Sequence, residues 1–145
     1  MYRVALWSLT GLFVARVAGQ LLQRWHEVSW LPPFDSWQGS RLPYGWLFAA
    51  QVAIIVIMAR LNFIYSSASV PRRLSRGRLF LALGSVYFVT MLGRWIVGMM
   101  NLSDAVWFHR HIPTLFHVVL ASYILLLGAY HMNWNVTKSI QQRQQ

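Results

Sequence analysis

The apolar residues of the chain fall into four long runs, which are separated by short polar segments. Each run is about 22 residues long, and a helix of that length rises about 33 Å, enough to cross a hydrocarbon core about 30 Å thick. The pattern therefore predicts an all-α integral membrane protein with four transmembrane helices. The runs are Val4–Trp25, Tyr44–Tyr65, Leu79–Met100 and Ile112–Met132.

The connections between these runs are short, which favours an antiparallel, up-down-up-down bundle. No internal repeat or flexible linker divides the chain, so we expect one transmembrane domain over residues 1–132. The last segment, residues 133–145, is polar and is expected to be a cytoplasmic tail.

Composition agrees with a location in a bilayer, because 57% of the residues are apolar and only 11% are charged. A net charge of +10 would suggest nucleic acid in a soluble chain. Here, however, the charges lie between apolar runs, and we expect no nucleic-acid partner. The chain has no cysteine, which excludes thiol nucleophiles, disulfide relays and Cys-ligated clusters.

The basic residues are distributed unequally between the two sides of the predicted bundle. In an alternating topology, eight of them share the side of both termini, and all three acids lie on the other side. Because cytoplasmic loops carry an excess of Lys and Arg, both termini are predicted to be cytoplasmic, in a bacterial inner membrane. The eight are Arg3, Arg60, Arg72, Arg73, Arg76, Arg78, Lys138 and Arg143, and the acids are Glu27, Asp35 and Asp104.

Two connections have a distinctive composition. The segment Ser66–Arg78 contains Pro71 and four arginines, and we expect a cytoplasmic hinge that acts as a topology signal or contacts anionic lipid headgroups. The connection after the first span combines two prolines with Trp30 and Trp37. It is expected to lie along the outer membrane surface.

Small residues recur every four positions on the first span, at Gly11, Ala15 and Gly19. Such a stripe lets another helix approach closely, because packing drives helix association in a membrane. We therefore expect Gly11, Ala15 and Gly19 to form a packing face. The pattern leaves open whether the neighbour belongs to this chain or to another subunit.

Two arginines lie within the predicted spans, where a charge costs at least about 2.5–3.5 kcal/mol. Arg94 is near a span end and can reach the interface, but Arg16 is nine residues from the outer end of its span. The spans contain no acid, so both arginines are candidates for binding an anion or a haem propionate. We expect Arg94 to extend outward to a lipid phosphate or to Asp104, Glu27 or Asp35. We expect Arg16 to bind an anion from elsewhere: a carboxylate of a partner subunit first, otherwise a haem propionate or a lipid headgroup. Other polar residues at a similar depth complete an expected polar layer: Gln20, Gln51, Thr90 and His117.

Two histidines share one face of the fourth span. His117 and His131 are 14 residues apart, which is about 21 Å along a helix, and Gly128 lies on the same face. With this spacing the span resembles the four-span b-type cytochromes that serve as quinone-linked membrane subunits. The resemblance implies two stacked haems and a second histidine for each iron.

The remaining spans supply few partners for such haems. His26 is the candidate partner of His117, whereas His131 has only Met58 as a weaker ligand, so at most one bis-histidine haem b is predicted. The pair His109 and His111 in the second outer loop matches no zinc or di-iron ligand set, and we predict no metal centre of that kind.

The first functional hypothesis is a non-enzymatic one. The small-residue stripe, the intramembrane arginines and the aromatic loop favour a small accessory or assembly subunit of a larger bacterial inner-membrane complex, respiratory or photosynthetic. Its partners would be other integral membrane subunits and membrane lipids. The alternative is a haem-b-binding, quinone-linked electron-transfer subunit. A transporter or lipid-handling enzyme would need an intramembrane acid, a broken helix or a nucleophile.

Overall fold

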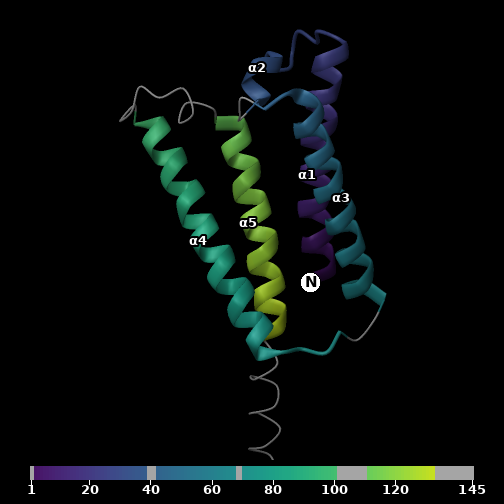
Figure 1. The fold of residues 1–145 in the computed structure, drawn as a ribbon, viewed down its shortest axis with the longest axis vertical. Coiled ribbons are helices and arrows are strands. Elements are labelled where there is room, and N and C mark those ends of the chain that lie inside the picture. The colour runs from purple at the N-terminus through teal and green to yellow at the C-terminus, as the bar shows by residue number, and fades with distance from the viewer. Residues whose placement is uncertain (1, 39–41, 68–69, 101–110, 133–145) are drawn as a thin grey trace, which may run out of the picture.

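The structure is a computed structural model, and it describes residues 2–38, 42–67, 70–100 and 111–132. Within these ranges the chain is entirely helical, without strands. Every helix except the short α2 is long and apolar enough to cross a membrane, which confirms the four predicted spans. The helices are α1 (Tyr2–Trp25), α2 (Phe34–Trp37), α3 (Tyr44–Ser67), α4 (Leu74–Met99) and α5 (His111–Met132) (Figure 1).

The largest difference from the predicted spans is the start of α4, at Leu74 and not at Leu79. The apolar run stops at Arg78, but arginine is a good helix former, so the helix continues through the polar turn. The expected hinge Ser66–Arg78 is therefore wrong in its extent, because α3 and α4 take up both of its ends. The predicted tail, residues 133–145, and Asp104 lie outside the described residues.

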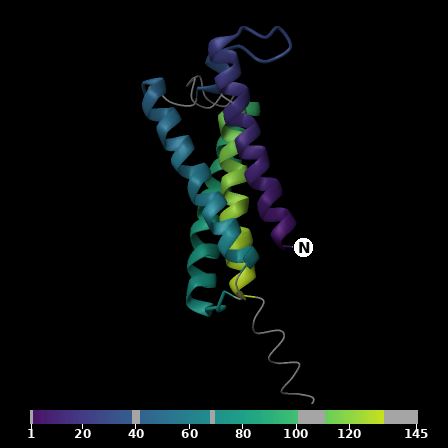
Figure 2. The same ribbon diagram turned by 90° about the vertical axis from the view of Figure 1, so that its right-hand side faces the viewer.

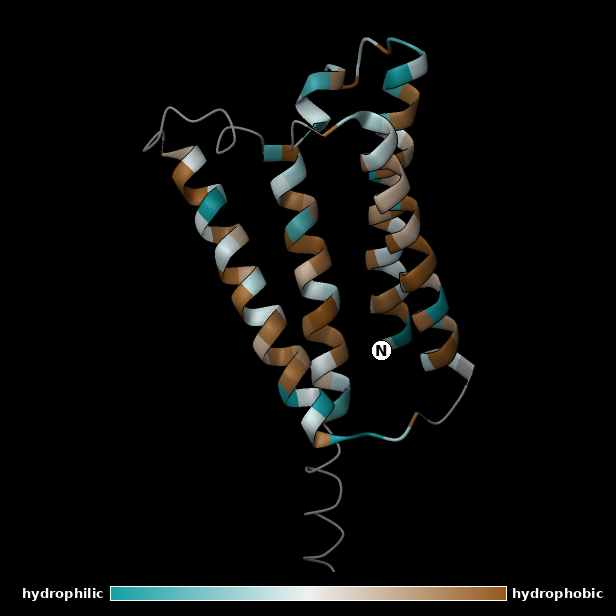
Figure 3. Cartoon of the chain, viewed as in Figure 1, coloured by the Kyte–Doolittle hydropathy of each residue, from teal (hydrophilic) through white to brown (hydrophobic). Residues whose placement is uncertain are grey.

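The long helices pack in the order α4, α5, α1, α3. Figure 1 shows α5 in the middle, with α4 to one side and the pair of α1 and α3 to the other. In Figure 2, turned by 90°, α3 and α1 lie on opposite sides of α5 toward the α2 end. Within the described residues α3 and α4 are not a packed pair, and the side of the bundle between them is open. Figure 3 shows apolar colour along the four long helices and polar colour at α2 and at the α3–α4 connection.

Glycines allow α4 and α5 to pack very closely. A Cβ atom on Gly84 would lie 2.9 Å from Cδ2 of Leu125, and one on Gly128 would lie 2.9 Å from the backbone nitrogen of Leu81. At Gly84 the nearest atom is the end of a side chain, which can shift, but at Gly128 backbone is as near, so no side chain fits there unless the helices move. The two helices therefore meet nearly backbone to backbone, as small residues permit in membranes. At the α2 end Figure 1 shows them apart.

The buried residues of α1 recur every three or four positions, as expected for a helix with one packed side. Its buried members include Leu6, Thr10, Phe13 and Val17. The apolar ones pack with residues of α3 and α5 in one core. This core contains Leu6, Phe13, Val17, Met58, Tyr123 and Leu127.

A buried hydrogen-bond chain crosses this core. The amide of Asn62 donates to Oγ1 of Thr10 at 2.9 Å, and the hydroxyl of Tyr123 donates to Oδ1 of Asn62 at 2.8 Å. The Tyr123 hydroxyl also lies 3.1 Å from the carbonyl oxygen of Met58. The chain joins α1, α3 and α5, and each of these polar groups has a partner, as burial in hydrocarbon requires.

We expect Tyr123→Phe to lower the free energy of unfolding by about 1–2 kcal/mol, because it leaves Oδ1 of Asn62 without a donor. Unfolding in mixed detergent micelles measures this change. Tyr130→Phe is the matched control, since its hydroxyl makes only a 3.5 Å contact with the carbonyl oxygen of Val70. Equal effects of the two substitutions would contradict the assigned role of the chain.

Candidate functional site

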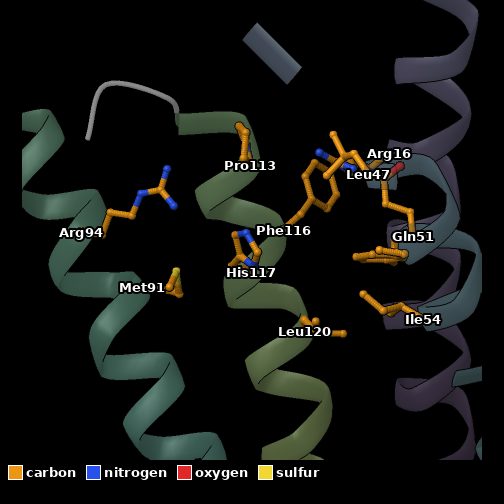
Figure 4. A pocket seen from close by; sticks show the side chains of 12 residues that line it. Arg16, Leu47, Gln51, Ile54, Met91, Arg94, Pro113, Phe116, His117 and Leu120 are labelled. Atoms are coloured by element: carbon orange, nitrogen blue, oxygen red, sulfur yellow. The ribbon is translucent and has the colours of Figure 1, made fainter. Parts of the chain in front are cut away.

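A groove of about 380 Å³ lies in the half of the bundle nearer α2. Its walls come from α3 and α4, and α1 and α5 contribute the residues between them (Figure 4). None of the described residues that line it is acidic. The lining residues are Phe13, Arg16, Leu47, Ala50, Gln51, Ile54, Met91, Arg94, Pro113, Phe116, His117 and Leu120.

The short helix α2 closes the groove above Arg16. Pro33 precedes α2 in an extended conformation, with φ −58° and ψ 149°, and the indole Nε1 of Trp37 donates to the carbonyl oxygen of Pro32 at 2.9 Å. The chain therefore folds back, and Trp37 becomes buried against Gly19, whose Cβ would lie 3.1 Å from the indole ring. Trp37 therefore packs against α1, and the location of this connection along the membrane surface stays a prediction.

Arg16 is 7% exposed and is held by groups of its own chain. One terminal nitrogen of its guanidinium donates to the carbonyl oxygen of Trp37 at 3.0 Å, and Cζ lies 5.8 Å from the centre of the Phe116 ring. The Nε atom is buried and has no hydrogen-bond partner among the described residues. Neutral groups thus orient the cation, and no carboxylate of the described chain neutralises it.

A pair of buried amides lies beside Arg16. Nε2 of Gln51 donates to Oε1 of Gln20 at 3.1 Å, which links α3 to α1. Gln51 is 4% exposed, and its Oε1 has no donor among the described residues, just as Nε2 of Gln20 has no acceptor there. A buried polar atom without a partner costs about 1–3 kcal/mol. Of these two atoms, Oε1 of Gln51 belongs to a residue that lines the groove, and the described chain leaves it without a donor.

On the opposite wall, the hydroxyl of Tyr87 lies 2.6 Å from Nδ1 of His117. This contact engages Nδ1 of the imidazole, so Nε2 is the ring nitrogen that the contact with Tyr87 leaves unused. His117 lines the groove together with the buried Arg94. The structure thus brings Arg16, Gln51, His117 and Arg94 to one groove, although they come from four different helices (Figure 4).

His131 lies at the other end of α5 in a closed environment. It is fully buried, its Nε2 lies 2.9 Å from the hydroxyl of Tyr65, and its Nδ1 accepts from the backbone N–H of Arg73 at 3.3 Å. Both ring nitrogens are therefore engaged. The Cβ atom of His131 also packs against Gly77 of α4, where an added Cβ would lie 3.1 Å away. The residue fastens α5 to α3 and to the start of α4.

These residues do not fit a pair of haems on α5. Gly128, on the face of α5 that carries His117 and His131, lies against Leu81 of α4, and Ala121 on the same face is fully buried. His26 is exposed just beyond α1, while His117 contacts Tyr87. Among the described residues there is also no group of three His, Asp or Glu side chains placed to hold a metal ion.

The three residues of the small-residue stripe on α1 have different surroundings. Gly19 contacts Trp37, but a Cβ added to Gly11 would meet nothing within 4 Å, and Ala15 is exposed. Gly11 and Ala15 therefore have no tight neighbour within the described chain. Whether another subunit packs there stays a prediction.

No protein-family model matches the chain, and no curated protein or solved structure matches it. The function must therefore be argued from the groove and from the open side of the bundle.

Proposed function

We propose that the chain is a small accessory or assembly subunit of a larger bacterial inner-membrane complex, respiratory or photosynthetic. The observation that supports this proposal is the open side between α3 and α4. In each of these helices less of the span is buried, 17% in α3 and 11% in α4, than the 33% of α1 and α5. The groove that lies at this opening is lined by Arg16, Gln51, His117 and Arg94.

A polar wall is costly where acyl chains would cover it, because hydrocarbon offers its groups no hydrogen bonds. A transmembrane helix of another subunit, lying over the gap between α3 and α4, would separate the groove from the surrounding bulk lipid. The exposed small residues Gly11 and Ala15 give a second partner a close approach on α1. An accessory role accounts for both features without requiring catalytic chemistry.

The proposed orientation places both termini in the cytoplasm and α2 outside, in an up-down-up-down bundle. We expect a reporter that is active only in the cytoplasm to work when fused after Ser75 or after Gln145. Alkaline phosphatase, which is active only outside the inner membrane, should be inactive at both positions. Phosphatase activity at either site would overturn the orientation.

Site-specific photocrosslinking tests the accessory role. A photoreactive residue at Met91, which lines the groove, should crosslink to one integral membrane subunit of a respiratory or photosynthetic complex. The same subunit should co-purify with the chain in mild detergent. Val86, on α4 and 69% exposed, is the control position and should give no such product, because it is not among the groove residues. A chain that purifies alone, with only lipid adducts at Met91, would contradict the proposal.

The alternative function, haem-b-linked electron transfer, has little support from α5. His131 is engaged at both nitrogens, and His117 has no second histidine in the groove among the residues that the structure describes. An absorption spectrum of the purified protein decides this alternative, since a bound haem b gives an intense Soret band.

A further inference from the structure

The groove has the composition of a binding site for an anion with an apolar body. Two arginines from different helices line it, each at most 7% exposed, and the described lining residues include no acid. Below them the walls are apolar, with Phe13, Ile54 and Leu120. Arg16, whose Nε is buried without a partner among the described residues, would be stabilised by an anion brought to it, and guanidinium groups favour phosphate and carboxylate oxygens.

The depth of the groove decides between a soluble and a membrane-borne anion. Arg16 lies nine residues before the end of α1, about 14 Å along the helix, and Arg94 lies five residues before the end of α4, about 8 Å. Above Arg16 the way to water is occupied by α2, whose Trp37 carbonyl accepts from the guanidinium. The open route is sideways, between α3 and α4, from the lipid.

We propose that the groove binds the headgroup of an anionic membrane phospholipid, which enters between α3 and α4. The phosphate lies between Arg16 and Arg94 and accepts from the free Nε–H of Arg16, while the acyl chains follow the apolar walls. Oε1 of Gln51, which has no donor among the described residues, accepts from a hydroxyl of the headgroup. A glycerol headgroup supplies both the anion and the hydroxyl, so phosphatidylglycerol is the best-matched class.

This inference does not depend on the accessory role, because it is tested on the purified chain alone. The chain in mild detergent is titrated with phosphatidylglycerol or phosphatidylcholine of identical acyl chains, and native mass spectrometry counts the bound lipids. We expect the apparent affinity for phosphatidylglycerol to be higher by about tenfold or more. Equal affinities for the two lipids would overturn the proposal.

Charge variants locate the site. Arg16→Gln and Arg94→Gln should each reduce phosphatidylglycerol binding to the level of phosphatidylcholine. Arg24→Gln is the matched control, because Arg24 lies on α1, like Arg16, but is exposed and outside the groove. An equal loss in Arg24→Gln would mean that general surface charge attracts the lipid, and the proposal would be wrong.

A steric variant keeps the proposal testable if the charge variants misfold. Ala50→Phe fills part of the groove and leaves every charge in place, so it should also lose phosphatidylglycerol selectivity. Retention of selectivity in this variant would contradict a site in the groove. So would displacement of the lipid by an excess of inorganic phosphate, which would identify a soluble anion. A loss of the partner subunit in Arg16→Gln with unchanged lipid binding would instead assign Arg16 to a partner carboxylate and overturn the lipid proposal.

Discussion

Gly128→Leu is expected to separate α4 from α5 and to lower the free energy of unfolding by about 3 kcal/mol or more. At this position even a Cβ atom would lie 2.9 Å from the backbone nitrogen of Leu81 and 2.8 Å from Cγ of the same residue. Backbone cannot move aside as a flexible side chain can, so the helices must shift apart. Overpacking of this kind costs about 1–3 kcal/mol, occasionally more, and a leucine is larger than the single methyl considered.

The chain offers a matched control for this substitution. Gly93 lies on α4, and a Cβ added there would meet nothing within 4 Å. Gly93→Leu should therefore be neutral or should raise the free energy of unfolding by about 0.5–1 kcal/mol, because leucine has the higher helix propensity. Unfolding of both variants in mixed micelles gives the comparison. If both variants have the same stability, α4 and α5 do not meet as closely as described.

Much of the fold was predictable because membrane spans are set by length and hydropathy. Both ends of the predicted spans Val4–Trp25 and Ile112–Met132 lie within two residues of the ends of α1 and α5. The start of α4 at Leu74 was missed because hydropathy marks where a helix enters the hydrocarbon and not where helical hydrogen bonding begins. The order of packing and the open side depend on contacts between distant segments, which periodicity does not encode.

The candidate site was predictable only in part. The depth of Arg16, Gln51, Arg94 and His117 followed from counting along each span, and the structure places all four in one groove. The first partner of Arg16 was missed, because it is the backbone carbonyl of Trp37, and a backbone group leaves no mark in the sequence.

The neighbour of Gly128 was not predictable for a related reason. Glycine signals space for a neighbour, but its position alone does not reveal what that neighbour is. A porphyrin, a lipid or another helix would each use the same gap. In this chain the neighbour is Leu81 of α4.

His131→Ala is expected to lower the free energy of unfolding by about 3 kcal/mol. The substitution removes a fully buried ring and leaves a cavity, and it deprives the Tyr65 hydroxyl and the Arg73 N–H of their partner. Large-to-small changes in a core cost about 2–5 kcal/mol, and each orphaned buried polar group adds about 1–3 kcal/mol. Relaxation of the helix ends and access of water to Arg73 reduce both contributions, so we expect a total in the lower part of the range for the cavity alone.

Two further variants distinguish the effect of lost hydrogen bonds from that of lost side-chain volume. They also distinguish a structural role of His131 from haem binding. His131→Phe keeps a ring that can stack on Phe80, as His131 does at 6.0 Å between ring centres, and should lose about half as much stability as the alanine variant. His26→Ala, at an exposed position, should leave the stability unchanged. If the wild-type protein instead carries a Soret band that His131→Ala abolishes while the folded fraction is unchanged, then the ring ligates iron in the membrane. Its contacts with Tyr65 and Arg73 would then belong only to the apoprotein.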